Sequence, residues 1–308
     1  LGNITNYSSP KQVGALTNWL SVACGVNHTV SIKTDGTLWS WGQNNYGQLG
    51  LGNTTNYSSP KQVGALTNWS SISCGYGHSV SIKTDGTLWT WGMNVSGQLG
   101  LGNVTYYSSP KQVGALTTWK NISEKYVSSF SVKSDGTLWA WGYNLFGQLG
   151  LGDITQRSYP FQVGTSSWTS VSAGGSHTMG IRSDSALFGW GLNTSGQLGL
   201  NTATTMSSPV QVGTSSWTSV SAGNSHALAI RNGGSLFGWG ANGSGSIGDG
   251  SNVTKSSPVQ IGTSSWTAIS AGGTHGVAIR SDGALFAWGP NTNGQLGSNS
   301  TSNTSSPI

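Results

Sequence analysis

Charged residues are the scarcest class in this sequence. Its 308 residues include 13 Lys and Arg and 8 Asp and Glu, which is 7% of the chain, against ~25% for an ordinary soluble domain. The net charge of +5 comes from scattered residues, and the chain has no Lys- or Arg-rich run. Recognition of nucleic acid needs a basic patch or stripe. The sequence therefore predicts no nucleic-acid partner.

Cysteines and long apolar runs are also scarce. Cys24 and Cys74 are the only cysteines, too few for a disulfide framework or a zinc site. They occupy equivalent positions of two repeats, where repeat 3 has Glu124 and repeats 4 to 6 have alanine, so we expect small, buried and free thiols. No run approaches the ~18 apolar residues of a spanning helix, which predicts no membrane insertion. Disorder is excluded as well, because aromatic residues make up 10% of the chain and disordered chains have few.

Glycine and tryptophan are abundant, with 48 and 15 copies, and they recur at a regular period. A Trp-Gly pair appears six times at a spacing of 50 or 49 residues; the pairs begin at Trp41, Trp91, Trp141, Trp190, Trp239 and Trp288. Such a period indicates an array of small structural repeats. Leu1 falls inside the repeated text, so we expect the chain to be a processed product or a piece of something longer.

Each repeat predicts four short antiparallel strands, named A to D. In repeat 2, strands A and B are expected at 69–73 and 78–83. Asp85-Gly86 is a strong hairpin signal, and strands C and D follow at 87–91 and 110–113. Four such strands per ~50 residues are typical of a propeller blade. The repeat segments that contain strands A to C are expected at about 19–50, 69–100, 119–150, 168–199, 217–248 and 266–297.

The text from His78 to Gly100 reads H-x-x-x-I-x-x-D-G-x-L-x-x-W-G-x-N-x-x-G-Q-L-G. This string resembles the regulator of chromosome condensation repeat. The resemblance implies an all-β fold, a β-propeller that usually has seven blades, whereas this chain has six A–B–C sets. We expect the lone strand D at Ser8–Val13 to complete the sixth blade and close the ring, with residues 297–307 left over. The alternative is six repeats cut from a longer array.

We interpret the recurring His, Lys and Arg residues as structural. Five repeats share a histidine, which we expect to bond backbone carbonyls between strands or blades. A ring of Lys or Arg residues, each two positions before Asp or Asn, could form an anion-binding rim, but a local charge pair is favoured. We predict no metal site and no cofactor. The histidines are His28, His78, His177, His226 and His275.

Two groups of residues are candidates for function. Aromatic and apolar residues occur in the loops around strand D of repeats 1 to 3, where we expect an arc of partner-binding side chains on one face. This group comprises Tyr46, Tyr57, Tyr106, Tyr107, Leu145 and Phe146. The second group breaks the repeat pattern: Glu124, Lys125 and Tyr126 replace the usual glycine-containing turn, and broken local rules often mark functional sites.

No catalytic arrangement is evident, so we predict that the chain is not an enzyme. The resemblance implies a possible guanine-nucleotide exchange factor, but the wedge-like insertion and acidic surface of that activity are not seen. We therefore expect a binding or structural module on an outer surface, an adhesin or assembly module, extracellular or on a particle. Its partner would be a protein or a carbohydrate, with self-assembly as a further option. The alternatives are an intracellular regulator of a small GTPase and a filament-forming building block.

Overall fold

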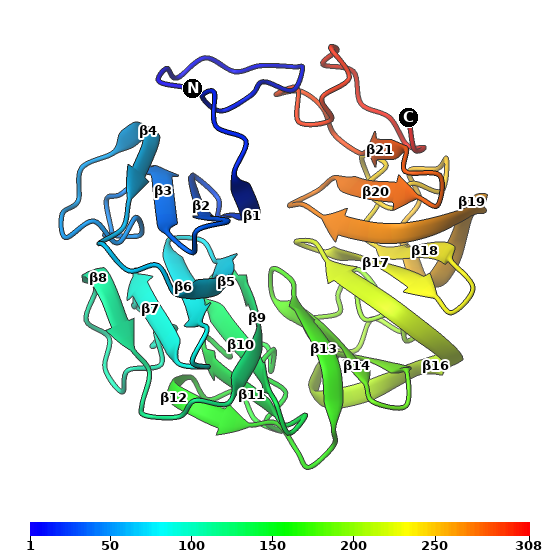
Figure 1. Cartoon of the computed structure of the whole chain (residues 1–308). Helices are drawn as coiled ribbons and strands as arrows, with labels where there is room; N and C mark the ends of the chain where they lie inside the picture. Colours follow the sequence, from blue (N-terminus) through cyan, green and yellow to red (C-terminus); the bar gives the residue numbers. More distant parts are fainter. The chain divides into compact units, whose positions relative to one another are not determined.

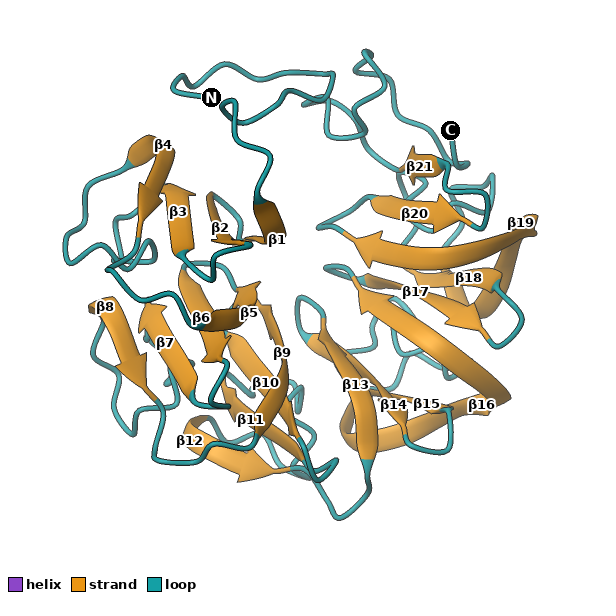
Figure 2. Cartoon of the chain, in the orientation of Figure 1, coloured by secondary structure: helices purple, strands orange, loops and turns teal.

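The computed structural model describes residues 1–308 and contains strands without helices (Figure 2). Repeats 1 to 3 each form a blade of four antiparallel strands, ordered A to D as in the chain (Figure 1). These strands are β1 (Trp19–Cys24), β2 (His28–Lys33), β3 (Leu38–Gly42), β4 (Tyr57–Gln62), β5 (Trp69–Cys74), β6 (His78–Lys83), β7 (Leu88–Gly92), β8 (Tyr107–Gln112), β9 (Trp119–Lys125), β10 (Ser128–Lys133), β11 (Leu138–Gly142) and β12 (Arg157–Gln162).

The last nine strands form one continuous sheet. Two of them, β16 and β19, have 17 residues each and serve as strand D of one blade and strand A of the next. The strands are β13 (Trp168–Ala173), β14 (His177–Arg182), β15 (Ala186–Gly191), β16 (Met206–Ala222), β17 (His226–Arg231), β18 (Ser235–Gly240), β19 (Lys255–Ala271), β20 (Gly276–Arg280) and β21 (Leu285–Trp288). No helix in the structure is long and apolar enough to cross a membrane.

The B–C hairpins show how the local sequence determines the turn. Gly86 has φ +78°, which favours glycine because it has no Cβ. The Lys83 N–H donates to the Thr87 carbonyl at 3.0 Å, and the Thr87 N–H donates to the Asp85 carboxylate at 3.0 Å. The Thr87 hydroxyl, which donates to the same carboxylate at 2.6 Å, and the Thr87 N–H together lower the pKa of Asp85. The Asp-Gly pair thus supplies the backbone conformation and the hydrogen-bond acceptor that the turn needs, and the turn aligns β6 with β7.

The core lies between successive blades. Trp69 and Trp91 of blade 2 pack in one buried cluster with Val30, Ile32 and Leu38 of blade 1. The Trp91 indole N–H donates to the Gln48 carbonyl of the preceding repeat at 2.9 Å. Equivalent indoles repeat this bond in later blades. Each large buried ring removes ~150–250 Å² from water, so blade-to-blade contact stabilises every repeat.

The chain divides into two compact units. The first contains Leu1–Ile4, Gln12–Leu145 and Thr155–Ser167, and therefore includes blades 1 to 3. The second contains Thr5–Lys11, Phe146–Ile154 and Trp168–Ile308, and includes blades 4 to 6.

The expected completion of blade 6 by Ser8–Val13 is wrong. These residues form no strand, and the position beside β21 is occupied by the end of the chain. Gly289 and Thr304 form a β-bridge, and Ala287 and Ile308 exchange two backbone hydrogen bonds of 3.1 Å. The C-terminal segment is close to β21 in sequence, so the loop that it closes is short and costs less entropy.

Candidate functional site

Four tyrosines come together where the A–B turns and C–D loops of the first unit meet. The Tyr46 ring lies 5.9 Å from the Tyr106 ring, edge to face. Tyr46 also lies against Gly77, because a Cβ on that glycine would approach the Tyr46 ring to 2.8 Å. The neighbouring residue, Tyr76, stacks on Tyr126 with ring centres 6.1 Å apart and planes inclined by 23°. We call Tyr46, Tyr76, Tyr106 and Tyr126 the tyrosine face.

The backbone holds the second tyrosine pair in place. The Tyr76 N–H donates to the Tyr126 carbonyl at 2.7 Å. Tyr126 has φ +47°, a left-handed conformation that costs a non-glycine residue roughly 1–2 kcal/mol. This conformational cost arises in the turn of repeat 3, which lacks the glycine-containing sequence of the other repeats. The result is a preformed aromatic pair that joins blades 2 and 3.

The tyrosine face is apolar and nearly uncharged. Tyr76, Tyr106 and Tyr126 are exposed, as are Val95 and Leu145 on neighbouring loops. The C–D loops of repeats 1 and 2 contain no charged residue. Single exposed apolar residues are ordinary, whereas contiguous ones indicate an interaction site. The arrangement suits contact with a protein surface through aromatic anchors.

The structure brings together only some of the predicted partner-binding residues. Tyr46 and Tyr106 touch, and Leu145 is exposed in the same unit. Tyr57 and Tyr107 instead begin β4 and β8, where Asn53 and Asn103 donate to their hydroxyls.

Phe146 is exposed too but belongs to the second unit, where its N–H donates to the Gln148 side chain at 3.0 Å. A binding role for these residues stays a prediction. Tyr76 is a member that the sequence analysis missed, although it occupies the same turn position as Tyr126 in the preceding repeat.

Glu124 is buried rather than presented to a partner. Its carboxyl oxygen Oε2 lies 2.9 Å from Nε2 of His78, and both side chains are fully enclosed. Burial raises the pKa of Glu124 and lowers the pKa of His78 to about 3, so the pair favours its uncharged forms. The Glu124 N–H also donates to Ser73 Oγ at 3.0 Å. Glu124 therefore links blade 3 to blade 2.

The other two pattern-breaking residues have different surroundings. Lys125 lies beside the tyrosine face, and burial lowers the pKa of its ammonium. Tyr126 is part of that face. The repeat histidine bonds to the next blade in repeats 1 and 2: His28 Nε2 lies 2.9 Å from Ser79 Oγ, as His78 lies near Glu124. These histidines bond between blades as expected, but their partners are side chains rather than the expected backbone carbonyls.

The recurring Lys and Arg residues make their contacts within their own blades. Lys83 Nζ lies 3.6 Å from the centre of the Trp89 ring, and Arg280 lies 4.8 Å from the Phe286 ring. Arg182 and Arg280 also pair with Asp184 and Asp282. Such cation–π and local ion pairs favour the structural interpretation over an anion-binding rim. No three His, Cys, Asp or Glu side chains lie close enough together to hold a metal ion.

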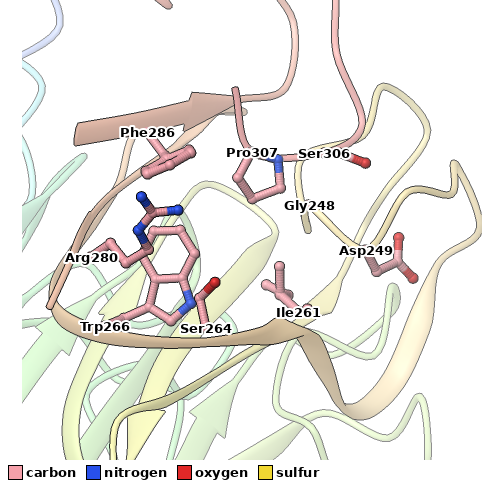
Figure 3. Close-up of a pocket in the computed structure, with 10 residues that line it drawn as sticks. Gly248, Asp249, Ile261, Ser264, Trp266, Arg280, Phe286, Ser306 and Pro307 are labelled. Atoms are coloured by element: carbon pink, nitrogen blue, oxygen red, sulfur yellow. The ribbon is translucent and has the colours of Figure 1, made fainter. Parts of the chain in front are cut away.

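Three equivalent pockets of about 270, 310 and 350 Å³ recur where successive repeats meet. In Figure 3, Trp266, Arg280 and Phe286 line one side of the smallest pocket and Pro307 another. Trp119, Trp139 and Pro160 line the equivalent pocket of repeat 3. Because the pocket recurs with the repeat, we attribute it to blade packing rather than to one ligand.

The cysteine prediction is right for one residue and wrong for the other. Both thiols are free, and Cys74 is buried, but Cys24 is exposed. Burial raises the pKa of the Cys74 thiol. Cys74 packs against the blade before it.

Comparison with known proteins agrees with this architecture. Residues 35–82, 85–124, 135–181, 184–230 and 233–279 match the regulator of chromosome condensation (RCC1) repeat, and a second form of that repeat matches residues 19–48, 69–98, 168–197, 217–246 and 266–295.

Human WBSCR16 shares the fold with a TM-score of 0.89 at 23% identity, over 98% of this chain and 83% of that one. Yeast RCC1 (Prp20) bound to Kap60 gives 0.83 at 19%, over 94% and 74%. Saccharomyces cerevisiae Prp20p, described with its binding to Gsp1p and histones, gives 0.81 at 20%, over 94% and 76%. The predicted all-β propeller fold is confirmed.

These comparisons overturn the main functional prediction. We expected an adhesin or assembly module at an extracellular or particle surface. The solved structures that share the fold include WBSCR16 and yeast RCC1, the latter described with Kap60, Gsp1p and histones. Their descriptions give no support to an adhesin, to carbohydrate binding or to self-assembly. The composition misled us, because a surface poor in charge does not specify a location.

Proposed function

Because the chain belongs to the regulator of chromosome condensation (RCC1) repeat family, we propose that it is an intracellular regulator that binds a small GTPase and promotes guanine-nucleotide exchange. The family resemblance supports this class of activity. Yeast Prp20p, of similar fold, is described as binding Gsp1p and histones, which are proteins. We propose a protein partner for this chain on the same basis.

The tyrosine face is the observation that carries the proposal. Tyr46 and Tyr106 touch, and Tyr76 and Tyr126 stack, on loops that carry almost no charge. Rigid aromatic side chains lose little conformational entropy on binding and dominate many protein interfaces. Backbone bonds already hold Tyr76 and Tyr126 together, so little further ordering is needed when a partner arrives.

Exchange by this chain would require no covalent chemistry. A protein that binds the nucleotide-free GTPase more tightly than the nucleotide-bound form must weaken nucleotide binding by the same factor. We therefore propose a regulator that is not a chemical catalyst. The repeats contain no inserted wedge, so the loops of the tyrosine face would make the contact themselves.

Binding to both nucleotide states tests this proposal. We expect the full chain to bind at least one member of a panel of small GTPases about tenfold more tightly without nucleotide than with GDP, which is the size of a typical coupling free energy. Tyr46→Ser with Tyr106→Ser should weaken that binding by at least about 30-fold, as expected for a hot spot of ≥ 2 kcal/mol.

Tyr57→Ser with Tyr107→Ser is the matched control, because these two tyrosines lie outside the tyrosine face. Equal loss in both double variants would show that the effect is not specific to this face. Equal affinity for the nucleotide-free and GDP-bound forms throughout the panel would exclude exchange activity.

A further inference from the structure

Repeat 5 lacks the acid that every other repeat places beside its recurring cation. In repeats 1 to 4 and 6, the residue two positions after the Lys or Arg is an aspartate. In repeat 5 this residue is Gly233, and the Asn of the sequence analysis, Asn232, directly follows the cation Arg231. Arg231 is therefore a cation without its local acid. The aspartates of the other repeats are Asp35, Asp85, Asp135, Asp184 and Asp282.

Repeat 6 shows how the missing acid binds its arginine. Arg280 donates from Nε to Asp282 Oδ1 at 3.1 Å and from Nη2 to Asp282 Oδ2 at 2.7 Å. The Ala284 N–H also donates to Asp282 Oδ1, at 3.2 Å. Arg182 binds Asp184 through the same two groups in repeat 4. Because the planar guanidinium matches a planar carboxylate, these repeats show which anion the position accepts.

The Arg231 guanidinium is held in place by two aromatic rings. Its Cζ lies 4.1 Å from the centre of the Phe237 ring and 5.1 Å from the centre of the Trp217 ring. Figure 3 shows the equivalent arrangement in repeat 6, where the Arg280 guanidinium lies between the two equivalent rings. These cation–π contacts fix the guanidinium but use none of its five N–H donors.

The donors of Arg231 have no acceptor in the chain. The side chain forms no ion pair and no hydrogen bond, and its Nε is buried without a partner. Buried donors are normally paired, and an unpaired one is destabilising. A carboxylate beside Arg231 would satisfy Nε and Nη2 together, as Asp282 satisfies those of Arg280.

The place of the missing side chain is open. A Cβ on Gly233 would have no heavy atom within 4 Å, and both Asn232 and Gly233 are exposed. Gly233 has φ +97°, a conformation that favours glycine because it has no Cβ. A carboxylate from outside the chain can therefore approach Arg231 as Asp282 approaches Arg280.

The openness of this turn also indicates the source of the carboxylate. A small-molecule site encloses most of its ligand, whereas the surroundings of Gly233 enclose nothing. Affinity must then come from further contacts of a larger molecule that carries the carboxylate. Arginine is enriched among the residues that dominate protein interfaces, and Arg231 is already fixed, so less ordering is needed on binding. An acidic side chain of a protein meets these requirements.

We propose that Arg231 and the turn at 232–234 bind an Asp or Glu side chain of a protein partner. The carboxylate accepts hydrogen bonds from Nε and Nη2 of Arg231, in the place that Asp282 takes in repeat 6. The B–C turn lies at the opposite end of the blade 5 strands from the A–B turn. The site therefore does not use the kind of loop that forms the tyrosine face, and the proposal does not rest on GTPase binding.

Nuclear magnetic resonance of the full chain tests the proposal through the backbone amide of Gly234. We expect a saturable shift of this signal with the peptide acetyl-Gly-Asp-Gly-amide and none with acetyl-Gly-Asn-Gly-amide. Gly233→Asp restores the Asp-Gly turn of repeat 6 and fills the site from within, so it should weaken peptide binding by at least about tenfold, the scale of a charged hydrogen bond.

Two matched variants separate the site from general charge effects. Arg231→Lys keeps the charge but loses the planar pair of donors, and it should also weaken binding by about tenfold. Arg280→Lys should leave binding at repeat 5 unchanged. Both variants should fold, because repeats 1 to 3 carry lysine at this position.

Four outcomes would overturn the proposal. Equal shifts with the Asp and Asn peptides would show that the carboxylate is not recognised, and unchanged affinity in Gly233→Asp would show that Arg231 is not the ligand. Tighter binding of inorganic phosphate than of the Asp peptide would assign the site to phosphate. Binding of acetate as tight as that of the peptide would assign it to a free carboxylic acid.

Discussion

His78 Nε2 lies 2.9 Å from Glu124 Oε2, with both side chains fully buried between blades 2 and 3. Burial of each group disfavours its charged form: the pKa of Glu124 is raised and that of His78 is lowered to about 3. The contact is additional to the 3.3 Å contact between His78 Nε2 and Ser129 Oγ, which is equivalent to the His28–Ser79 bond of the preceding interface. A pattern-breaking acid thus became part of the core, where its ionisation has an energetic cost.

Glu124→Gln should remove the pH dependence that Glu124 contributes to stability. A folded-state pKa above the unfolded value stabilises the fold fully below the unfolded pKa, near 4.5, and this contribution is lost as pH rises toward the folded value. The difference in unfolding free energy, variant minus parent, should therefore increase from pH 5 to pH 8, by at most about 1.4 kcal/mol per pH unit. Denaturant titrations across this range check it, and parallel curves would contradict it.

His28→Ala should destabilise the fold by about 1–3 kcal/mol at pH 7.5, because Ser79 loses its buried partner. The pKa of His28 is lowered by burial to about 4. The stability that the neutral histidine contributes is present above its ordinary pKa of 6.5 and is lost as pH falls toward 4. The cost of the substitution should shrink over that interval. If the loss of unfolding free energy in His28→Ala were constant between pH 7.5 and 4.5, the histidine would not contribute through its neutral form. A chelator should leave the melting temperature of the parent chain unchanged.

Features of the fold that are determined by residues within one repeat could be predicted from the sequence, and features that depend on contacts between repeats could not. The period of the Trp-Gly pairs was sufficient to predict the β-propeller fold, because each repeat carries its own turn signals. The fusion of strands D and A into β16 was missed. Four residues separate Val212 from Trp217, as they do Val163 from Trp168, where β12 and β13 stay separate, so the length of the connection does not predict the fusion.

The candidate site was harder to predict because its contacts join different repeats. Tyr46 and Tyr106 were both candidates, but their contact depends on how the loop of one blade overlaps the next. The partner of Glu124 likewise follows from the stagger between blades, which no single repeat encodes. The short connection between β21 and the C-terminal segment also favours pairing of β21 with that segment over pairing with the N-terminal segment.

Lys83→Ala should cost about 0.5–2 kcal/mol of unfolding free energy, because the ammonium lies 3.6 Å from the centre of the Trp89 ring and part of its stem is buried. Lys111→Ala is the control: Lys111 is exposed and lies 5.4 Å from the Tyr107 ring. Chemical denaturation of both variants measures the difference. Equal effects would show that the Trp89 contact adds nothing specific.

Deletion of residues 304–308 should speed amide exchange at Ala287 and Gly289 by at least about tenfold, because both amides donate to this segment and an unprotected amide exchanges by local opening. Deletion of residues 1–13 should leave exchange at these two amides unchanged. If the N-terminal deletion exposed Ala287 and the C-terminal deletion did not, residues 8–13 would be the strand beside β21 after all.

The rate at which fluorescent GDP leaves a small GTPase tests the central claim most directly. A GTPase from the panel that binds the full chain should release GDP at least about tenfold faster in its presence, because most affinity differences between related complexes appear in the dissociation rate and a coupling of about 1.4 kcal/mol is tenfold in affinity. Tyr46→Ser with Tyr106→Ser should abolish this acceleration, and Tyr57→Ser with Tyr107→Ser should retain it. Release at the unassisted rate from every GTPase that the chain binds would contradict the proposed exchange function.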